Sequence, residues 1–593
     1  SVSPWKHTLD HEPTALEYRC HWTPPLAFDP FEEETVYYGC QVIFRTRDRG
    51  QTWEVISPDL STQDPERVAW SGGIPGADPP RVIGDNLGQF YGEVVFAIAP
   101  SRLERGLIWA GTNDGLVWVT RDGGGRWRKV SQNIEGLPAW GTVRKIEPSP
   151  FDPGTAYVAV DFHMMDDRRP YLFKTTDYGE SWKNVTGDLP SGHPLDYVMA
   201  VAENPNRRGM LFAGTGRGFY FSMDDGRSWT LLQEGLPTAP VTWVVVEPRY
   251  HDVVVSTYGR GLFVLRDVTT LEQADAVAEG PSHLYAPRPG FRQAREGRAD
   301  FLYRLATAPA GSVRFDVLDG AGTVIRSFDT EGRAGLNAVS WDLLYEGPAQ
   351  VELRTVPPDN PHIWEEGRFI DQETRPIIHW GIQSPQRRGP IAAPGAYTVR
   401  MTVDGRSVTR PFTVLRDPAI PTSDDELVAS TRTQLRIRDG MNAAVDMINR
   451  LEVMRKQVEE LEAAHAADAE VTAALAELER KMYETELAFL SRTDMHSDDK
   501  WYVEAYRIYM QYVWLSAEVG LGGGDVQGGA EYAPTAAALE WLETLEGELA
   551  TATTAFDRIV RTEVPEFNRT WAGRIPRIVV PARERVADGS GGG

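Results

Sequence analysis

The sequence predicts a mainly β protein: an N-terminal β-propeller, then a β-sandwich and a C-terminal helical bundle. Three observations lead to this prediction. A short pattern, [ST]-x-D-x-G-x-x-W, occurs four times and ends at Trp53, Trp127, Trp182 and Trp229. Short apolar runs with period-two alternation continue from Pro287 to Leu415. From Ser423 onward the apolar spacing changes to three and four residues, as in amphipathic helices.

Each part of the repeated pattern has a physical role. The aspartate accepts hydrogen bonds from backbone N–H groups further along the chain and so fixes a tight turn. The glycine adopts a backbone angle that other residues resist, and the tryptophan buries a large ring between neighbouring sheets. Because four copies make an internal repeat, we interpret the aspartates as turn residues; metal binding or catalysis is the disfavoured alternative. They are Asp48, Asp122, Asp177 and Asp224.

Three apolar runs precede each tryptophan, and Gly, Pro, Asn and Asp bound them, which is typical of antiparallel strands. Four such strands form a blade, and radially arranged blades form a propeller. Five blade-like units precede Asp267, and the fifth lacks the pattern and a fourth strand. We therefore expect residues 1–270 to be a partial propeller, completed by an N-terminal segment or a second chain. The alternative is a closed five-bladed ring in which residues 1–17 supply the missing strand.

The repeated pattern is identified as the Asp box, or BNR repeat, of sialidases, sortilins and xyloglucanase-type propellers. The chain resembles large secreted bacterial BNR-repeat proteins, which are glycosyl hydrolase-like or sortilin-like. Residues 256–267 resemble the strand that ends their propeller, and residues 394–400 resemble their β-sandwich. The resemblance covers nearly the whole chain. It implies this architecture and a secreted location, and it is less specific about chemistry.

Composition narrows the classes of partner. The formal net charge of −24 disfavours nucleic acid and anionic membrane surfaces. No run of 18 apolar residues occurs, so we expect no membrane span. The chain opens at Ser1 without a signal-like stretch, which leaves a removed leader or a fragment as explanations.

The chain has two cysteines, Cys20 and Cys40. Cys20 precedes the first strand of the first blade and Cys40 ends the second strand, so antiparallel pairing brings them within disulfide range. We predict a disulfide and hence an oxidising compartment, either extracellular or periplasmic. Two buried free thiols are the alternative.

After the propeller, residues 280–418 are expected to form the β-sandwich, interrupted by a Pro-rich loop over residues 345–390. A capping box, Ser423 to Glu426, starts the first helix of a four-helix bundle over residues 422–565. Further helices are expected near residues 470–490, 500–519 and 534–563. Self-packing of these helices is favoured over a coiled-coil partner site, and residues 566–593 are expected to be an extended tail.

The residues best suited to binding lie at the end of the blades opposite the Asp boxes. Because strands alternate in direction, two kinds of segment meet at this end: the turns between second and third strands, and the segments that lead into each sheet. If the protein hydrolyses glycans, we predict Asp161 and Asp196 as the catalytic acid and base. The alternative is ordinary turn residues around a filled axis. The expected ligand contacts are Glu93, Asp114, Trp140, His163, Tyr197, Arg217, Trp243, Tyr258 and Arg260.

Other catalytic templates are missing from the sequence. It has no Gly-x-Ser-x-Gly elbow, no P-loop and no His-Glu-x-x-His, and we expect no cofactor and no metal. We expect an extracellular or periplasmic platform that binds a glycan or protein ligand. A xyloglucanase-like glycoside hydrolase and a structural subunit of a larger assembly are the alternatives.

Overall fold

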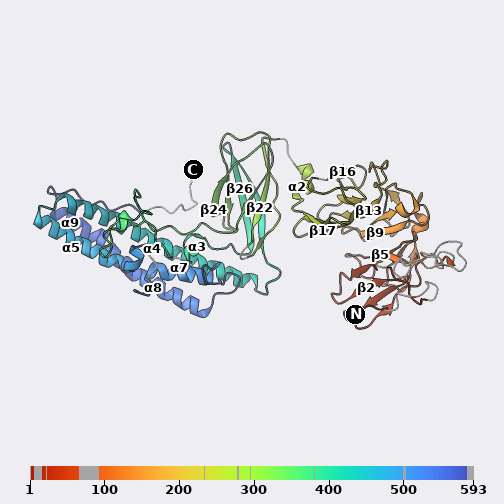
Figure 1. Cartoon of the computed structure of the whole chain (residues 1–593), viewed down its shortest axis with the longest axis horizontal. Coiled ribbons are helices and arrows are strands. Elements are labelled where there is room, and N and C mark those ends of the chain that lie inside the picture. Colours follow the sequence, from red (N-terminus) through yellow and green to blue (C-terminus); the bar gives the residue numbers. More distant parts are fainter. Residues whose placement is uncertain are drawn as a thin grey trace. The chain divides into compact units, whose positions relative to one another are not determined.

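A computed structural model describes residues 2–5, 16–21, 23–65, 93–232, 234–276, 280–293, 296–379, 381–497 and 502–583. The fold is mainly β, with a helical C-terminal region (Figure 1). The chain divides into two compact units, Ser1–Asp275 and Ala276–Gly593. No helix within the described ranges is long and apolar enough to cross a membrane.

The first unit consists of five antiparallel sheets that follow one another along the chain (Figure 1). The first four have four strands each and the fifth has three, and each sheet keeps the order of its strands in the chain. The strands are β1 (Leu26–Phe28), β2 (Val36–Gly39), β3 (Ile43–Thr46), β4 (Glu54–Val55), β5 (Val95–Pro100), β6 (Ile108–Thr112), β7 (Val117–Thr120), β8 (Arg128–Lys129), β9 (Thr142–Pro148), β10 (Ala156–Asp161), β11 (Tyr171–Thr175), β12 (Lys183–Asn184), β13 (Val198–Glu203), β14 (Leu211–Thr215), β15 (Phe219–Ser222), β16 (Thr230–Leu231), β17 (Val241–Glu247), β18 (Asp252–Thr257) and β19 (Gly261–Leu265).

The first strands of all five sheets line one cavity of about 330 Å³, so the sheets are arranged around a common axis. This is how blades are arranged in a β-propeller. Buried Lys145 of β9 crosses the axis, where its Nζ lies 2.6 Å from the carbonyl oxygen of Val244 in β17 and 4.7 Å from the Trp243 ring.

The four repeated turns share one hydrogen-bond pattern. In each, the carboxylate Oδ1 accepts from the backbone N–H four residues later, at 2.8 Å for Asp48 and 2.9 Å for the other three. The residue after the aspartate has a left-handed φ in every copy, as does the glycine that follows. In the second, third and fourth sheets that glycine packs against the segment after the preceding sheet; a Cβ atom on Gly124, for example, would lie 2.5 Å from the Ile56 carbonyl oxygen.

The fifth sheet is open on one side. Its last strand, β19, exposes Leu262 (73%) and Val264 (52%), and on the same face β17 exposes Trp243 and Val245. Sheet-to-sheet contacts follow chain order, and within the described residues no pair of elements joins the first and fifth sheets by more than marginal contact.

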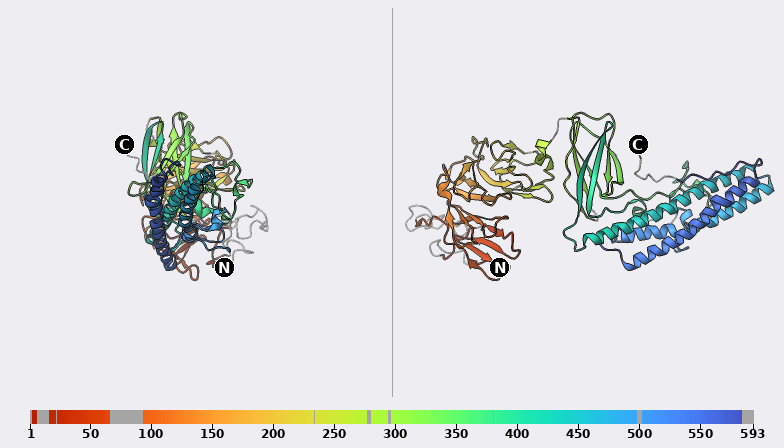
Figure 2. Two further views of the ribbon diagram at one scale, coloured as in Figure 1. Left: turned by 90° about the vertical axis from the view of Figure 1, so that its left-hand side faces the viewer. Right: turned by 180° about the vertical axis from the view of Figure 1, so that it is seen from behind.

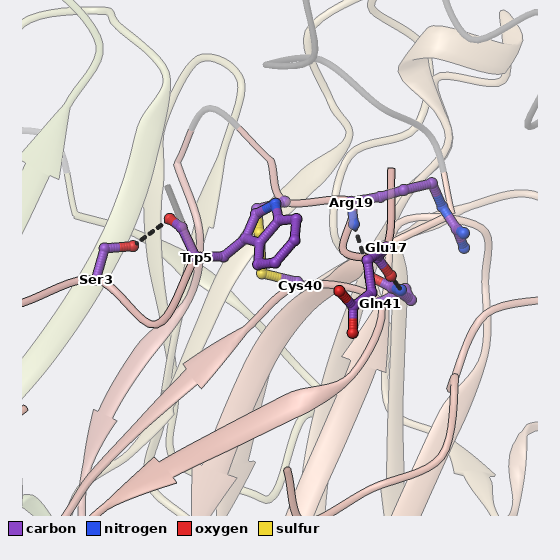
Figure 3. Close-up of a disulfide and its surroundings, with 7 residues drawn as sticks. Ser3, Trp5, Glu17, Arg19, Cys40 and Gln41 are labelled. Carbon is purple, nitrogen blue, oxygen red and sulfur yellow. Dashed lines mark hydrogen bonds between the residues drawn. A yellow bond between two sulfur atoms is a disulfide. The ribbon is translucent and has the colours of Figure 1, made fainter. Parts of the chain in front are cut away.

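A disulfide joins Cys20 and Cys40, with the Cα atoms 4.1 Å apart. The Trp5 ring lies beside the sulfur atoms (Figure 3). Next to the bridge, the Gln41 side chain accepts a hydrogen bond from the Arg19 N–H and donates one to the Glu17 carbonyl. These bonds fasten the segment before β1 to the end of β2.

The second unit begins with two sheets around one core. One has the order β20 (Ser282–Leu284), β22 (Ala299–Leu305), β25 (Gly335–Trp341). The other has the order β21 (Gly290–Arg292), β27 (Arg406–Arg416), β26 (Gly395–Val403), β23 (Val313–Leu318), β24 (Val324–Thr330). Their shared core contains Phe301, Phe315, Trp341 and Phe412, whose rings lie about 5–6 Å apart.

Four longer helices share a second core and run side by side (Figure 2): α4 (Asp424–Ala464), α5 (Ala469–Glu486), α7 (Ile508–Val519) and α8 (Ala536–Arg558). The predicted capping box is confirmed, since Ser423 and Glu426 bond each other reciprocally at the start of α4. Gly440 of α4 permits the approach of α7, because a Cβ atom there would lie 2.5 Å from the Tyr512 ring.

Two boundaries in the helical region differ from the prediction. The helix expected over residues 500–519 begins at Ile508, and residues 498–501 lie outside the described part. The tail expected from residue 566 starts as helix: after the π-helical turn η7 (Ile559–Glu563), α9 continues over Val564–Thr570. Residues up to 583 then return to α4, where Gln457 bonds both backbone groups of Val579. Residues 584–593 lie outside the described part.

The loop between β25 and β26 lies along α4 within the second unit. Backbone N–H groups of residues 349–356 donate to side chains of α4, at Asn442, Asn449, Glu452 and Glu459. Short helices, η6 (Ile363–Glu365) and α3 (Gln383–Arg387), follow in the same loop.

Candidate functional site

The predicted site residues lie on the first unit, at the end of the sheets opposite the four repeated turns. Segments leading into β5 and β13 carry Glu93 and Asp196, and turns after β6 and β14 carry Asp114 and Arg217. Asp161 ends β10, and His163 begins the short helix η4 (His163–Met165). The four acidic residues, Glu93, Asp114, Asp161 and Asp196, lie in three separate local clusters.

The first cluster is centred on Asp161, whose side chain is 1% exposed. Its carboxylate accepts from Arg144 Nε at 3.0 Å, from His163 Nδ1 at 2.7 Å and from the His163 backbone N–H at 2.9 Å. The His163 ring stacks on Tyr197 at 4.5 Å, and Arg144 lies 5.2 Å over Phe96. Asp161 therefore holds an imidazole and a guanidinium in fixed orientations.

The second cluster is an ion pair between Asp196 and Arg217. The carboxylate accepts from Arg217 Nε at 2.7 Å and from the His193 backbone N–H at 2.6 Å. Asp196 is buried, whereas the Arg217 side chain is 36% exposed. The arginine is thus the accessible member, and the aspartate orients it.

The third cluster joins Glu93 and Asp114 through Thr62. The Thr62 hydroxyl donates to Glu93 Oε1 at 3.1 Å, and its backbone N–H donates to Asp114 Oδ2 at 2.7 Å. The other carboxylate oxygens, Glu93 Oε2 and Asp114 Oδ1, are buried and lack a hydrogen-bond partner among the described residues. Burial, together with the nearby Asp114 charge, raises the pKa of Glu93 to about 7.

The remaining predicted contacts have unequal access to a ligand. Tyr258 is 77% exposed and Arg260 is also exposed. Trp140 is half-buried at a left-handed φ of 71°, and Tyr197 is buried beneath His163. Trp243 lies within β17 and lines the axial cavity beside Lys145, so it does not lie in the segment leading into the sheet, where the sequence had placed it.

Asp161 and Asp196, predicted as a catalytic pair, each sit in a cluster of their own with a cationic partner. The structure places these two carboxylates in separate clusters and so does not bring the predicted pair together. Sequence reasoning missed three residues whose local pattern does not mark them: Arg144, which contacts Asp161, Thr62, which contacts Glu93 and Asp114, and Arg19, which donates to the Glu93 carbonyl. Within the described residues, no group of three His, Cys, Asp or Glu side chains is placed to hold a metal ion.

No protein-family model matches the chain. The chain is 24% identical over 237 residues to a xyloglucanase of Hypocrea jecorina, a match that covers 38% of this chain and 27% of that protein. It is 26% identical over 286 residues to the xyloglucanase Xgh74A of Acetivibrio thermocellus, covering 42% and 30% respectively. The chain thus spans less than a third of the length of these curated relatives.

Two solved structures are also similar. The GH74 xyloglucanase from Xanthomonas campestris matches at 17% identity over 56% of this chain and 47% of that chain, with a TM-score of 0.30. YCF48 from Cyanidioschyzon merolae matches at 14% identity over 56% of this chain and 98% of that chain, with a TM-score of 0.27. Scores this low do not establish a shared fold.

Proposed function

We propose that the first unit is a β-propeller platform that binds a polysaccharide at the end carrying Arg217, Tyr258 and Arg260. The observation that carries the proposal is the accessibility of these groups: Tyr258 and Arg260 are exposed, and Arg217 is partly exposed and oriented by Asp196. An exposed aromatic ring stacks on the apolar face of a sugar, and guanidinium groups donate to its hydroxyls. The sequence similarity to xyloglucanases supports a polysaccharide over a protein ligand.

A second candidate is glycoside hydrolysis, favoured by the Glu93–Asp114 pair. Hydrolysis of a glycosidic bond needs one protonated and one ionised carboxyl group. A pKa of about 7 for Glu93 beside a second carboxylate meets this requirement at neutral pH. Both side chains are buried, so substrate access would require Thr62 to move.

One set of variants, tested on xyloglucan, distinguishes the binding function from the cleavage function. Tyr258→Ala and Arg260→Ala should each weaken binding in affinity electrophoresis about five- to tenfold. Glu93→Gln and Asp114→Asn should leave binding intact and abolish any release of reducing ends. Asp161→Asn is the comparison variant, whereas Asp196→Asn removes the group that orients Arg217 and should weaken binding. If none of the six variants changed binding or cleavage, this end of the sheets would carry no function.

We also propose identities for the repeated turns and for the second unit. We infer that the four repeated turns are Asp boxes, and that the second unit combines a β-sandwich with a four-helix bundle. A secreted or periplasmic location is supported by the disulfide. The open fifth sheet supports completion of the propeller by further β-sheets, from an N-terminal segment or a second chain, and a structural role in a larger assembly stays an alternative.

A further inference from the structure

After α9 the chain reverses and runs back over the helical bundle as an extended segment, residues 574–583, which we call the strap. In the turn before it, the Trp571 carbonyl oxygen accepts a hydrogen bond from the N–H group three residues later, at 3.0 Å. Ile575 and Ile578 of the strap are buried in the core that the helices share, and Val580 packs against this core. The residues between these three are exposed. The strap thus inserts selected apolar side chains into the bundle and leaves the others in solvent.

Amide side chains of two helices bind the backbone of the strap. Asn568, in α9, accepts from the Ile578 N–H and donates to the Ile578 carbonyl oxygen, both at 2.8 Å. Gln457, in α4, makes the same pair of bonds with Val579, at 2.8 and 3.0 Å. Proteins recognise extended peptides in this way: main-chain hydrogen bonds supply affinity, and pockets for particular side chains supply specificity. The bundle therefore holds the strap as it would hold a bound peptide.

The charges of the strap and of the helices beneath it are complementary. Every charged residue of the strap is an arginine, in a chain whose formal net charge is −24. Arg574, at one end, lies 2.8 Å from Glu470 and 3.0 Å from Asp468, at the start of α5. Arg583, at the other end, lies 3.9 Å from Asp446 of α4. The groove under the strap is thus apolar along its length and acidic at both ends, which fits an apolar, basic peptide.

The contacts that fasten the strap favour its release from the groove. The acidic partners of Arg574 are 42% and 72% exposed, and ion pairs this exposed contribute little. Gly573, in the turn before the strap, has a left-handed φ of 82° and open space around it, so the strap has a hinge. Within the described residues, the strap beyond Ile575 makes no backbone hydrogen bond to another backbone group. Segments attached in this way open locally while the helices stay folded.

We propose that the groove under the strap is an exchangeable peptide-binding site, and that its partner is the strap of a second copy of this chain. The strap of a second copy carries the same isoleucines and arginines, so it makes the same contacts with the groove. Such an exchange forms as many contacts as it breaks and is therefore governed by how close two chains are held. This surface lies within the second unit and does not depend on polysaccharide binding by the first.

Fluorescence anisotropy with a labelled peptide of residues 571–583 tests the proposal on the full chain. In the wild type, the tethered strap competes with the peptide. Ile578→Asp places a charge in the apolar core contact and so displaces the strap, while the groove itself is unchanged. This variant should bind the peptide at least about tenfold more tightly than the wild type does. The same peptide with Ile578→Asp is the control ligand and should not bind. Absent peptide binding by the variant, or equal affinity of variant and wild type, would overturn the proposal.

The partner itself is tested with two full chains. Immobilised Ile578→Asp has an empty groove, so it should retain the wild-type chain, which has an intact strap, more than it retains Ile578→Asp. Both chains carry the same fifth sheet, so any association through that sheet cancels in the comparison. Equal retention of the two chains would rule out the second copy as the partner.

Hydrogen exchange on the wild-type chain requires no substitution and so covers the case in which Ile578→Asp does not fold. The N–H groups of Ile578 and Val579 should exchange at least about tenfold faster than those of α4 around Gln457, because the strap opens separately from the helices. Equal protection of the strap and α4 would show that the strap does not leave its groove.

Discussion

At the scale of single residues, the aspartates of the four repeated turns accept short hydrogen bonds from nearby residues. The Asp48 carboxylate accepts from the Thr52 backbone N–H, the Thr52 hydroxyl and the Thr46 hydroxyl, at 2.7–2.8 Å. The Thr52 N–H and these hydroxyls lower the pKa of Asp48 to about 2. The turn is therefore held by the ionised form of the aspartate.

The lowered pKa predicts a loss of stability in acid. A depressed carboxyl pKa stabilises the folded state above the unfolded value, near 4, and this stabilisation is lost as the pH falls toward 2. Asp48→Asn should remove this part of the pH dependence when urea unfolding is compared at pH 5 and pH 2.5. Asp166→Asn, at a side chain 96% exposed, is the control and should unfold like the wild type. An unaltered acid response in Asp48→Asn would contradict the prediction.

The raised pKa of Glu93 predicts that stability depends on pH in the opposite direction. Its pKa rises from 4.5 to about 7 on burial, so the folded state favours the protonated form. The free energy of unfolding should therefore decline as the pH rises from about 5 through 7, where a buried carboxyl must ionise. Glu93→Gln should flatten this decline in urea midpoints measured from pH 5 to pH 8. A decline of the same size in the variant would assign it to another group.

At the scale of elements, one buried arginine connects α4 and α5. Arg455, whose side chain is 2% exposed, contacts Glu452 at 3.0 Å, Glu479 at 2.7 Å, and Glu486. Three carboxylates therefore share one cation. Burial raises the pKa of Glu486 well above its usual range, whereas the nearby Arg455 charge lowers it. Glu452 also accepts the Thr355 N–H, which ties the loop between β25 and β26 to the same cluster.

Removal of this cation should destabilise the second unit strongly. Arg455→Met leaves buried carboxylates without a counter-charge, at an expected cost of about 3–5 kcal/mol in chemical denaturation. Arg436→Met is the matched control, since its ion pair with Glu546 is 41% exposed on both sides. That variant should lose less than about 1 kcal/mol. Equal losses in the two variants would show that burial of the cluster is unimportant.

Some features of the structure could be predicted from the sequence and others could not, and the reason is the distance along the chain between the residues involved. The turn aspartates were predictable because all their partners lie within four residues. The capping box at Ser423 was predictable for the same reason. The surroundings of Asp161 were not, because Arg144 reaches it from another strand of its sheet, and its partner His163 stacks on Tyr197, which leads into the next sheet. Likewise, the helical start of the expected tail at Val564 depends on packing against the bundle core, which periodicity alone does not reveal.

At the scale of the whole molecule, the fifth sheet predicts association of the first unit. Leu262 and Val264 lie exposed on an edge strand, which pairs readily with another strand, and the adjoining face exposes Trp243 and Val245. We expect the full chain to associate with rising concentration in sedimentation velocity, and Leu262→Lys with Val264→Lys to suppress this. A wild-type protein that stays monomeric at all concentrations would contradict this prediction.

The residue after each turn aspartate also bears on how neighbouring sheets are joined. Asp225, in the turn of the fourth sheet, accepts from the Tyr157 hydroxyl at 2.7 Å and from Lys174 Nζ at 2.6 Å, both in the third sheet. Gly123 stands at the same position in the turn of the second sheet, with the same left-handed backbone. Glycine and aspartate codons are one base apart, so a single point mutation can add or remove a charged link between two sheets. Because each joint is built from its own pair of repeats, such links can be gained or lost independently while the scaffold is inherited unchanged.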